Sequence, residues 1–353
     1  MTPEEALTLA KTVSDIYAQA TADLLSLVAR RLSKGMDSPR WADERLAELL
    51  VLRRDAQRVV SQMQQAAHTE VVGMLEKAYA GGRLSPLSSP GMVATNQRAV
   101  FALARDTTRA LDSTAPRVLR WTEDIYRQVI AETVSGSVVG TSTRRQVAAK
   151  AMDRFARQGV LGFKDSAGRN WSLSSYAEMT TRTATGQAFL EGTLDRYQAN
   201  GDDLVIVSNS PEECPLCRPY EGNVLSISGS LTAPPGLPEG IRFMGSLSAA
   251  RDAGLYHPNC THRADRYVPG LTKPNPDTEN PQGYEDRQTQ RYLERKVREA
   301  KQQLVAAKGM GDPVMLRVVQ KKHAERMAAL QEFNVTHGRK QGVSAARINL
   351  AHR

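Results

Sequence analysis

The sequence of 353 residues predicts an α+β protein that is predominantly α-helical. Apolar residues recur every three or four positions through most of the chain, and two short aliphatic runs flank a Cys-x2-Cys pair. The last part of the chain is basic and amphipathic. We expect an N-terminal helical domain (1–135), a small α/β middle domain held together by zinc (136–270), a linker (271–286) and a basic helical tail (287–353).

The N-terminal part is predicted to consist of long helices. A capping box with a proline at the first helical position begins at Thr2, and the apolar spacing continues to Gly35. The pattern resumes after Ser38 and ends near Ala80, where a Gly-Gly pair should stop the helix. The expected helices cover residues 3–35, 38–80, 96–111 and 116–135.

The middle part of the chain changes from a helical pattern to a strand pattern after residue 199. Two helices are expected before this change, one ending near Gln158 and one over residues 174–199. Residues 203–208 and 224–227 then read as strands, because they are short, aliphatic and bounded by turn residues. Residues 229–245 are rich in proline and glycine, which predicts an irregular excursion with little core of its own.

The cysteines and two of the histidines gather in two short motifs. All 3 cysteines and 2 of the 6 histidines lie in CPLC and HPNCTH. Zinc prefers four tetrahedral thiolate and imidazole ligands, and Cys214 and Cys217 on a tight turn would supply two. His257, Cys260 and His262 then compete for the other two places. The spacing favours Cys260 and His262, with His257 as the alternative ligand.

The predicted zinc is structural, because an all-Cys/His ligand set leaves no open position for a substrate. Buried inert thiols are one alternative, but their coincidence with the histidines argues against it. A thioredoxin-like redox pair is another, but such a pair should open a helix instead of lying between strands. An odd number of cysteines also predicts a reducing compartment without disulfides.

The basic charge is concentrated in the tail. Residues 287–353 carry 15 Lys and Arg against 5 Asp and Glu, a net charge of +10, whereas the whole chain carries +9. A cationic helical segment on a near-neutral body favours a polyanionic partner, although a solvated helix face is the simpler reading. The predicted nucleic-acid contacts are Arg291, Arg295, Lys296, Arg298, Lys301, Lys321, Lys322 and Arg326.

Three stretches of the sequence resemble a known family. They are GFKDSAGRNWSLSSYAEMTTRT (162–183), CPLCRPYEGNVLSI (214–227) and LYHPNCTHRADRYVPG (255–270), and the basic run QRYLERKVR (290–298) adds to the likeness. The family is the phage minor capsid protein 2 group, which is related to the Mu F-like head morphogenesis proteins. Relatives usually carry Cys-x2-Cys and then His-Pro-x-Cys-x-Cys, so His262 stands where the last cysteine would be.

The resemblance implies a non-enzymatic protein of the virion. It would lie in the capsid interior near the portal vertex, after assembly in the host cytoplasm. The implied partners are the portal protein and phage DNA, bound without sequence specificity, with the major capsid or scaffolding protein as a further candidate. The implied role is to assist packaging or ejection. No run of the sequence is long and apolar enough to predict a membrane span.

Other functions remain as alternatives. The CPLC and HPNCTH pair faintly resembles HNH-type enzymes, which predicts a zinc-bound nuclease as the main alternative. Such an enzyme also needs a base and a free ligand for a catalytic ion, and Asp252 is the nearest upstream acid. A toxin-like transferase would need an extra domain, of which the sequence gives no sign. A zinc-ribbon nucleic-acid-binding protein of bacterial origin also fits the motifs.

Overall fold

The computed structural model describes most of the chain. The described residues are 3–83, 96–138, 142–158, 161–164, 170–210, 212, 214–258, 260–273 and 280–339. The middle of the predicted linker (274–279) and the end of the predicted tail (340–353) lie outside them, as do residues 165–169 of the first family-like stretch.

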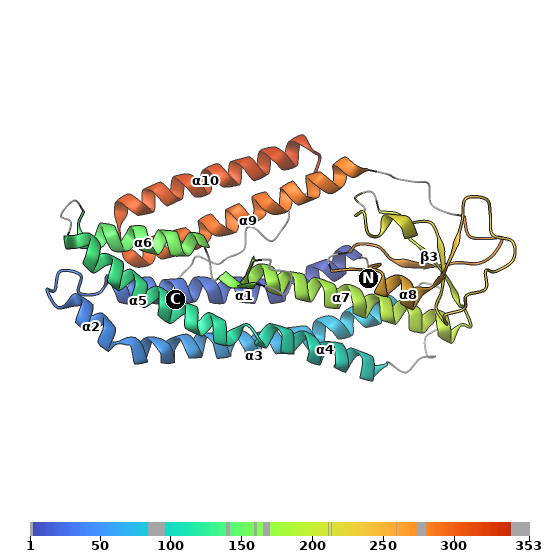
Figure 1. Ribbon diagram of the computed structural model, residues 1–353, viewed down its shortest axis with the longest axis horizontal. Coiled ribbons are helices and arrows are strands. Elements are labelled where there is room, and N and C mark those ends of the chain that lie inside the picture. The colour runs from blue at the N-terminus through green and yellow to red at the C-terminus, as the bar shows by residue number, and fades with distance from the viewer. Residues whose placement is uncertain are drawn as a thin grey trace. The chain divides into compact units, whose positions relative to one another are not determined.

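Helices dominate the described residues, and the strands are short (Figure 1). The helices are α1 (Pro3–Ser33), α2 (Trp41–Ala47), α3 (Leu49–Arg83), α4 (Gln97–Asp112), α5 (Ala115–Val138), α6 (Arg144–Gln158), α7 (Leu173–Ala199), α8 (Leu247–Asp252), α9 (Pro281–Met310) and α10 (Pro313–Thr336). The strands are β1 (Leu161–Lys164), β2 (Asn170–Ser172), β3 (Leu204–Val207), β4 (Val224–Ser226), β5 (Phe243–Ser246) and β6 (Ala264–Arg266), and η1 (Arg218–Tyr220) is a 3-10 helix. This confirms the predicted fold class.

Two details of the N-terminal helices differ from the prediction. The second predicted helix is divided at Glu48 into α2 and α3. The Gly-Gly pair does not stop α3, which continues to Arg83. Gly82 lies inside the helix because it has a packing role that the sequence alone does not reveal.

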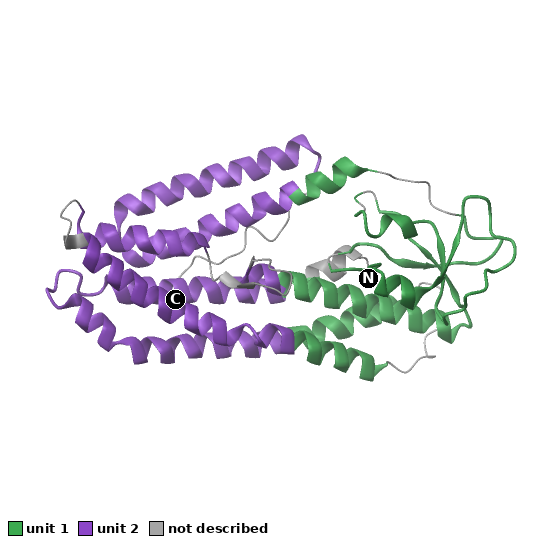
Figure 2. Cartoon of the chain, in the orientation of Figure 1, with its two compact units in different colours: residues 1–12, 69–108, 178–288 green, residues 13–68, 109–177, 289–353 purple. Residues whose placement is uncertain are grey.

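The chain divides into two compact units, each assembled from separate stretches of sequence (Figure 2). The first unit comprises residues 1–12, 69–108 and 178–288, and the second comprises residues 13–68, 109–177 and 289–353. The domains expected from the sequence pattern are consecutive ranges of the chain, and that division stays a prediction.

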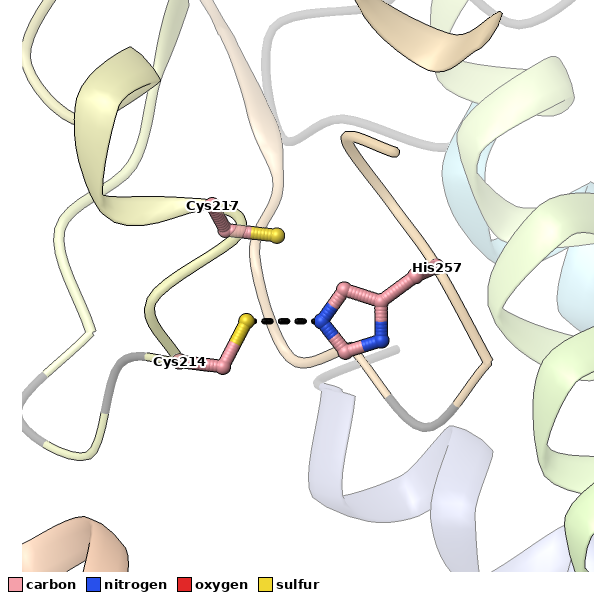
Figure 3. A group of neighbouring side chains, drawn as sticks. All are labelled: Cys214, Cys217 and His257. Atoms are coloured by element: carbon pink, nitrogen blue, oxygen red, sulfur yellow. Dashed lines mark hydrogen bonds between the residues drawn. The ribbon is translucent and has the colours of Figure 1, made fainter. Parts of the chain in front are cut away.

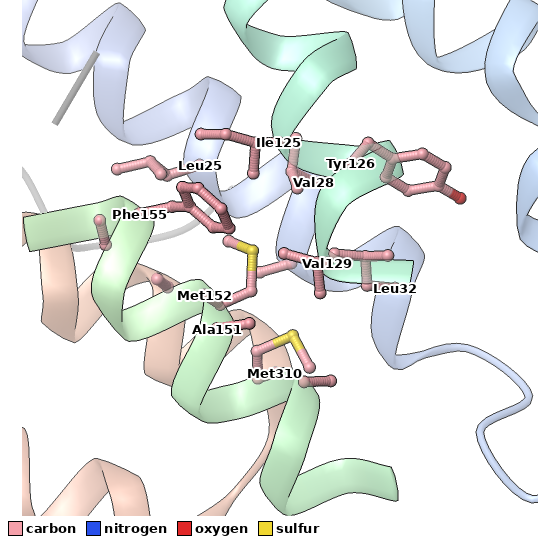
Figure 4. Close-up of a cluster of buried hydrophobic side chains, with 14 of the residues drawn as sticks. Leu25, Val28, Leu32, Ile125, Tyr126, Val129, Ala151, Met152, Phe155 and Met310 are labelled. Carbon is pink, nitrogen blue, oxygen red and sulfur yellow. The ribbon is translucent and has the colours of Figure 1, made fainter. Parts of the chain in front are cut away.

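The second unit is built around a helical core (Figure 4). Val28 of α1, Val129 of α5 and Met152 of α6 are fully buried, and Met310 at the end of α9 joins them. Burying an aliphatic side chain of this size contributes about 1.5–3 kcal/mol. Because Met310 belongs to the predicted tail, part of that tail lies in the core of this unit.

The first unit contains a four-stranded mixed sheet in the order β5-β4-β3-β6. β3 pairs antiparallel with β4 and β6, and β4 pairs parallel with β5. The predicted strands around residues 203–208 and 224–227 are confirmed as β3 and β4. β5 (FMGS) and β6 (ADR) were not predicted, because they lack the aliphatic run that marks β3 and β4.

Two helices of the first unit approach each other closely at glycines. A Cβ atom built on Gly82 of α3 would lie 2.1 Å from the carbonyl oxygen of Phe189. A Cβ atom on Gly192 of α7 would lie 2.1 Å from the carbonyl oxygen of Tyr79. Only glycine fits at both positions, so each helix brings its backbone against that of the other.

Candidate metal centre

Two turns beside β3 position the cysteines. In the first turn the amides of Cys217 and Arg218 donate to the carbonyl oxygen of Cys214, at 3.2 and 3.1 Å. In the second turn the amide of Cys260 donates to the carbonyl oxygen of His257 at 2.9 Å. Tyr256, directly before this turn, has a φ of 58°, which few residues other than glycine adopt. Both cysteine-bearing segments are therefore turns closed by backbone hydrogen bonds.

The two turns form a first group of possible ligands, shown in Figure 3. Cys214, Cys217 and His257 present ligand atoms that all lie within 4.8 Å of one another. The Nε2 atom of His257 is 2.7 Å from the sulfur of Cys214. This distance is shorter than the roughly 3.5 Å between sulfur and nitrogen ligands of a tetrahedral zinc, so metal binding here would require the two atoms to separate.

A second group shares Cys217 with the first. Cys217, Cys260 and His262 also present ligand atoms within 4.8 Å of one another. The sulfurs of Cys217 and Cys260 are 3.5 Å apart, and the Cys260 sulfur is 3.2 Å from Nδ1 of His262. Tetrahedral zinc holds two sulfurs roughly 3.8 Å apart, so the spacing of this group is closer to that of a zinc site.

Each histidine is oriented by a partner on its outer nitrogen. Nε2 of His262 donates to a carboxylate oxygen of Glu221, and both side chains are buried. Nδ1 of His257 donates to the carbonyl oxygen of Pro258 at 2.8 Å. Such partners fix the tautomer and leave the inner nitrogen with a lone pair for a metal. In its neutral form each ring therefore turns an acceptor nitrogen towards the sulfurs.

The pKa values of the clustered side chains are shifted because these groups lie close together. The hydrogen bond to Cys260, together with burial, raises the pKa of Cys217 to about 12, while the same bond lowers the pKa of Cys260. Burial alone would lower the pKa of His262, but hydrogen bonds to Cys217 and Glu221 raise it overall. The pKa values of Cys217 and Cys260 are therefore shifted in opposite directions. A cation between the two sulfurs would offset the repulsion between two thiolates.

The structure brings together all five residues that the sequence singled out. Cys214, Cys217 and His257 form one group and Cys217, Cys260 and His262 the other, so a Cys/His group within metal-binding distance is present. Which of these residues bind a metal stays a prediction. Glu221 was missed as a partner of the site, because the sequence showed it only as part of a turn.

The predicted nucleic-acid contacts differ in exposure. Arg298 and Lys301 are buried, and burial lowers the pKa of Lys301. The guanidinium group of Arg326 already makes one hydrogen bond within the protein, because it donates to the carbonyl oxygen of Lys296 at 2.8 Å. Lys321 is exposed to solvent. A buried ammonium or guanidinium group cannot reach a phosphate in the folded protein, so the exposed members are the better candidates.

Comparison with known proteins decides the family. The model of the family described as phage minor capsid protein 2 matches residues 1–334. The chain belongs to this family. A minor capsid protein is a component of the virion, so membership assigns the chain to the structural proteins of a phage. The resemblance seen in the sequence is thereby confirmed.

This phage minor capsid protein also has a curated relative, named as a structural protein of Lactococcus phage LL-H. The two are 26% identical over 199 residues, which cover 53% of this chain and 52% of the relative. The match thus spans about half of the relative's length. No solved structure matches the chain. Among the described helices of the minor capsid protein, none combines the length and apolar character of a membrane span.

Proposed function

We propose that this protein is a non-enzymatic component of the phage head, located inside the capsid near the portal vertex. There it contacts the portal protein and DNA and assists packaging or ejection. The family match over residues 1–334 is the observation that carries the proposal. The concentration of positive charge after residue 286 supports the DNA contact, because the phosphate backbone attracts a cationic segment whatever the base sequence of the DNA.

The DNA contact is tested with exposed basic residues of the C-terminal helices. We choose Arg295, Arg317 and Lys321, because α9 also supplies core residues and truncation would disrupt the second unit. Replacing all three with glutamine should weaken plasmid binding and flatten its salt dependence, by roughly 0.9 in the log–log slope for each phosphate that the protein no longer neutralises. The matched control replaces the exposed Arg54, Arg98 and Arg105. Equally weakened binding in both triple variants would remove the tail from the proposal.

The metal is proposed to be a structural zinc bound by Cys214, Cys217, Cys260 and His262, with His257 as the alternative ligand. The donor set supports this assignment, since thiolate and imidazole ligands suit zinc and the outer nitrogen of each histidine is already held. Purified protein should contain one zinc per chain, and a strong chelator should lower its melting temperature. Protein that is fully folded without metal would overturn the structural role.

A nuclease would be revealed by the same plasmid assay. The proposed function predicts a mobility shift that fades with salt and leaves the plasmid supercoiled, with or without Mg²⁺ or Mn²⁺. Metal-dependent nicking that disappears in a His257→Ala protein would replace the structural role with the HNH-like alternative. A separate pull-down with the portal protein of the same phage tests the proposed location, since the proposal requires direct binding.

A further inference from the structure

A long, narrow groove runs along one face of α7 in the first unit. Its volume is about 170 Å³, and its walls come from α7, the end of α3 and residues 260–265. Arg182 and Arg196 of α7 both line it. An α-helix rises about 1.5 Å per residue, so these two positions are roughly 21 Å apart along the helix. The groove therefore has the shape of a thin channel and not of a round cavity.

The groove is lined by more positive than negative groups. Arg182, Arg196 and Arg263 contribute guanidinium groups, and Asp265 contributes a carboxylate. The Nε atom of Arg182 is buried and has no hydrogen-bond partner among the described residues. Its ion pair with Glu178 is long, at 3.4 Å. A buried donor without a partner is unfavourable, and an oxyanion in the groove would satisfy it.

Gly186 leaves the groove open, although no packing contact requires a glycine at this position. It lies in the interior of α7, where glycine is less favourable than alanine. A Cβ atom at this position would meet nothing within 4 Å, in contrast to Gly82 and Gly192, whose Cβ atoms would collide with backbone. Gly186 stands one helical turn from Arg182 and also lines the groove. Its missing side chain leaves room beside the guanidinium group.

We propose that this groove binds an extended, acidic peptide segment of a partner protein. An extended chain rises about 3.3 Å per residue, so six or seven residues would span the groove. Carboxylates of such a segment would pair with the arginines, while its apolar parts would contact Phe189 and Leu190 between them. The apolar side chains of Phe189 and Leu190 between the arginines favour a peptide, because a bare phosphate backbone offers them no apolar partner.

The test uses the protein of 353 residues as purified and a labelled peptide of about seven residues with alternating glutamate and alanine. An otherwise identical peptide with glutamine in place of glutamate reports the charge requirement. Gly186→Leu should fill the groove and weaken binding at least about tenfold, which is the effect of about 1.4 kcal/mol. Gly73→Leu is the matched control, because Gly73 is also inside a helix with nothing within 4 Å of its Cβ and does not line the groove.

The outcomes are distinct. Binding of the glutamate peptide that is lost with glutamine and with Gly186→Leu, but kept with Gly73→Leu, supports the proposal. Equal binding of the two peptides, or no effect of Gly186→Leu, overturns it. A short oligothymidylate that binds more tightly than the peptide and loses affinity in Gly186→Leu would assign the groove to single-stranded nucleic acid instead. DNA binding through the C-terminal helices is unaffected by any of these results.

Discussion

Glu221 holds His262 by a hydrogen bond between two buried side chains. A carboxylate in this position orients the imidazole and increases its basicity as a ligand. We expect Glu221→Gln to reduce zinc affinity about 10- to 100-fold, the usual effect of losing such a partner. Competition with a calibrated chelator measures it. An unchanged affinity would show that His262 is not a ligand or that its ring needs no support.

The choice between the two histidines can be made by comparing two variants. The spacing of the second ligand group predicts that His262→Ala loses stoichiometric zinc, whereas His257→Ala retains it. Cobalt substitution provides the measurement, because the visible spectrum reports the number of thiolates and the tetrahedral geometry. The opposite pattern, with zinc lost only from His257→Ala, would assign the fourth place to His257.

The glycine contact between α3 and α7 predicts a large effect of a single methyl group. Gly82→Ala places a carbon 2.1 Å from the carbonyl oxygen of Phe189, so the helices must separate. We expect the free energy of unfolding to fall by about 3 kcal/mol or more, as in severe overpacking. Gly73→Ala in the same helix meets nothing and should instead add up to about 1 kcal/mol. Chemical denaturation of the two variants gives the comparison.

Asp203 should contribute stability that depends on pH. Burial alone would raise its pKa, but hydrogen bonds from Ser228 and Ser226 lower it below the ordinary value of 3.8. A carboxyl group with a lowered pKa stabilises the fold above its ordinary pKa, and this contribution is lost as the pH falls through the folded-state value. Asp203→Ala should therefore cost about 1–3 kcal/mol near neutral pH. Denaturation below pH 3 should show a smaller difference.

Lys301 should have the opposite pH dependence. Burial lowers its pKa in the folded state, partly offset by Asp15, so the unfolded chain binds its proton more tightly. Stability is then reduced while the pH lies below the folded-state pKa, and it rises as the pH increases towards the ordinary value of 10.5. Lys301→Met should stabilise the protein at neutral pH and leave DNA binding unchanged. A loss of DNA affinity in this variant would mean that the side chain becomes exposed.

The long helices were predictable because their signals are local and repeated. At the start of α10, Asp312 accepts from the amides of Val314 and Met315, and an aspartate followed by proline is a frequent helix start. The burial of Lys301 was not predictable. The sequence of α9 shows one apolar stripe, but the helix is buried on more than one face. The convergence of the two cysteine motifs could be predicted from residue type alone.

Other features of the site depend on tertiary contacts. A lone glutamate in a turn gives no sign that it will meet His262, which is 41 residues away. The role of Gly82 is equally hidden, because a glycine that ends a helix and one that admits a neighbouring helix look the same in a sequence. β6 is defined by its pairing with β3 and not by its own composition.

The position of β3 between β4 and β6 has a consequence for synthesis. Cys217 leaves the ribosome 43 residues before Cys260, and β6 follows only after that second cysteine. At about 5–20 residues per second, the first two thiols wait roughly 2–9 s for their partners. During this interval Cys214 and Cys217 lack the residues that lie beside them in the folded protein. If the proposed zinc binds, its set of ligands is therefore complete only after this interval.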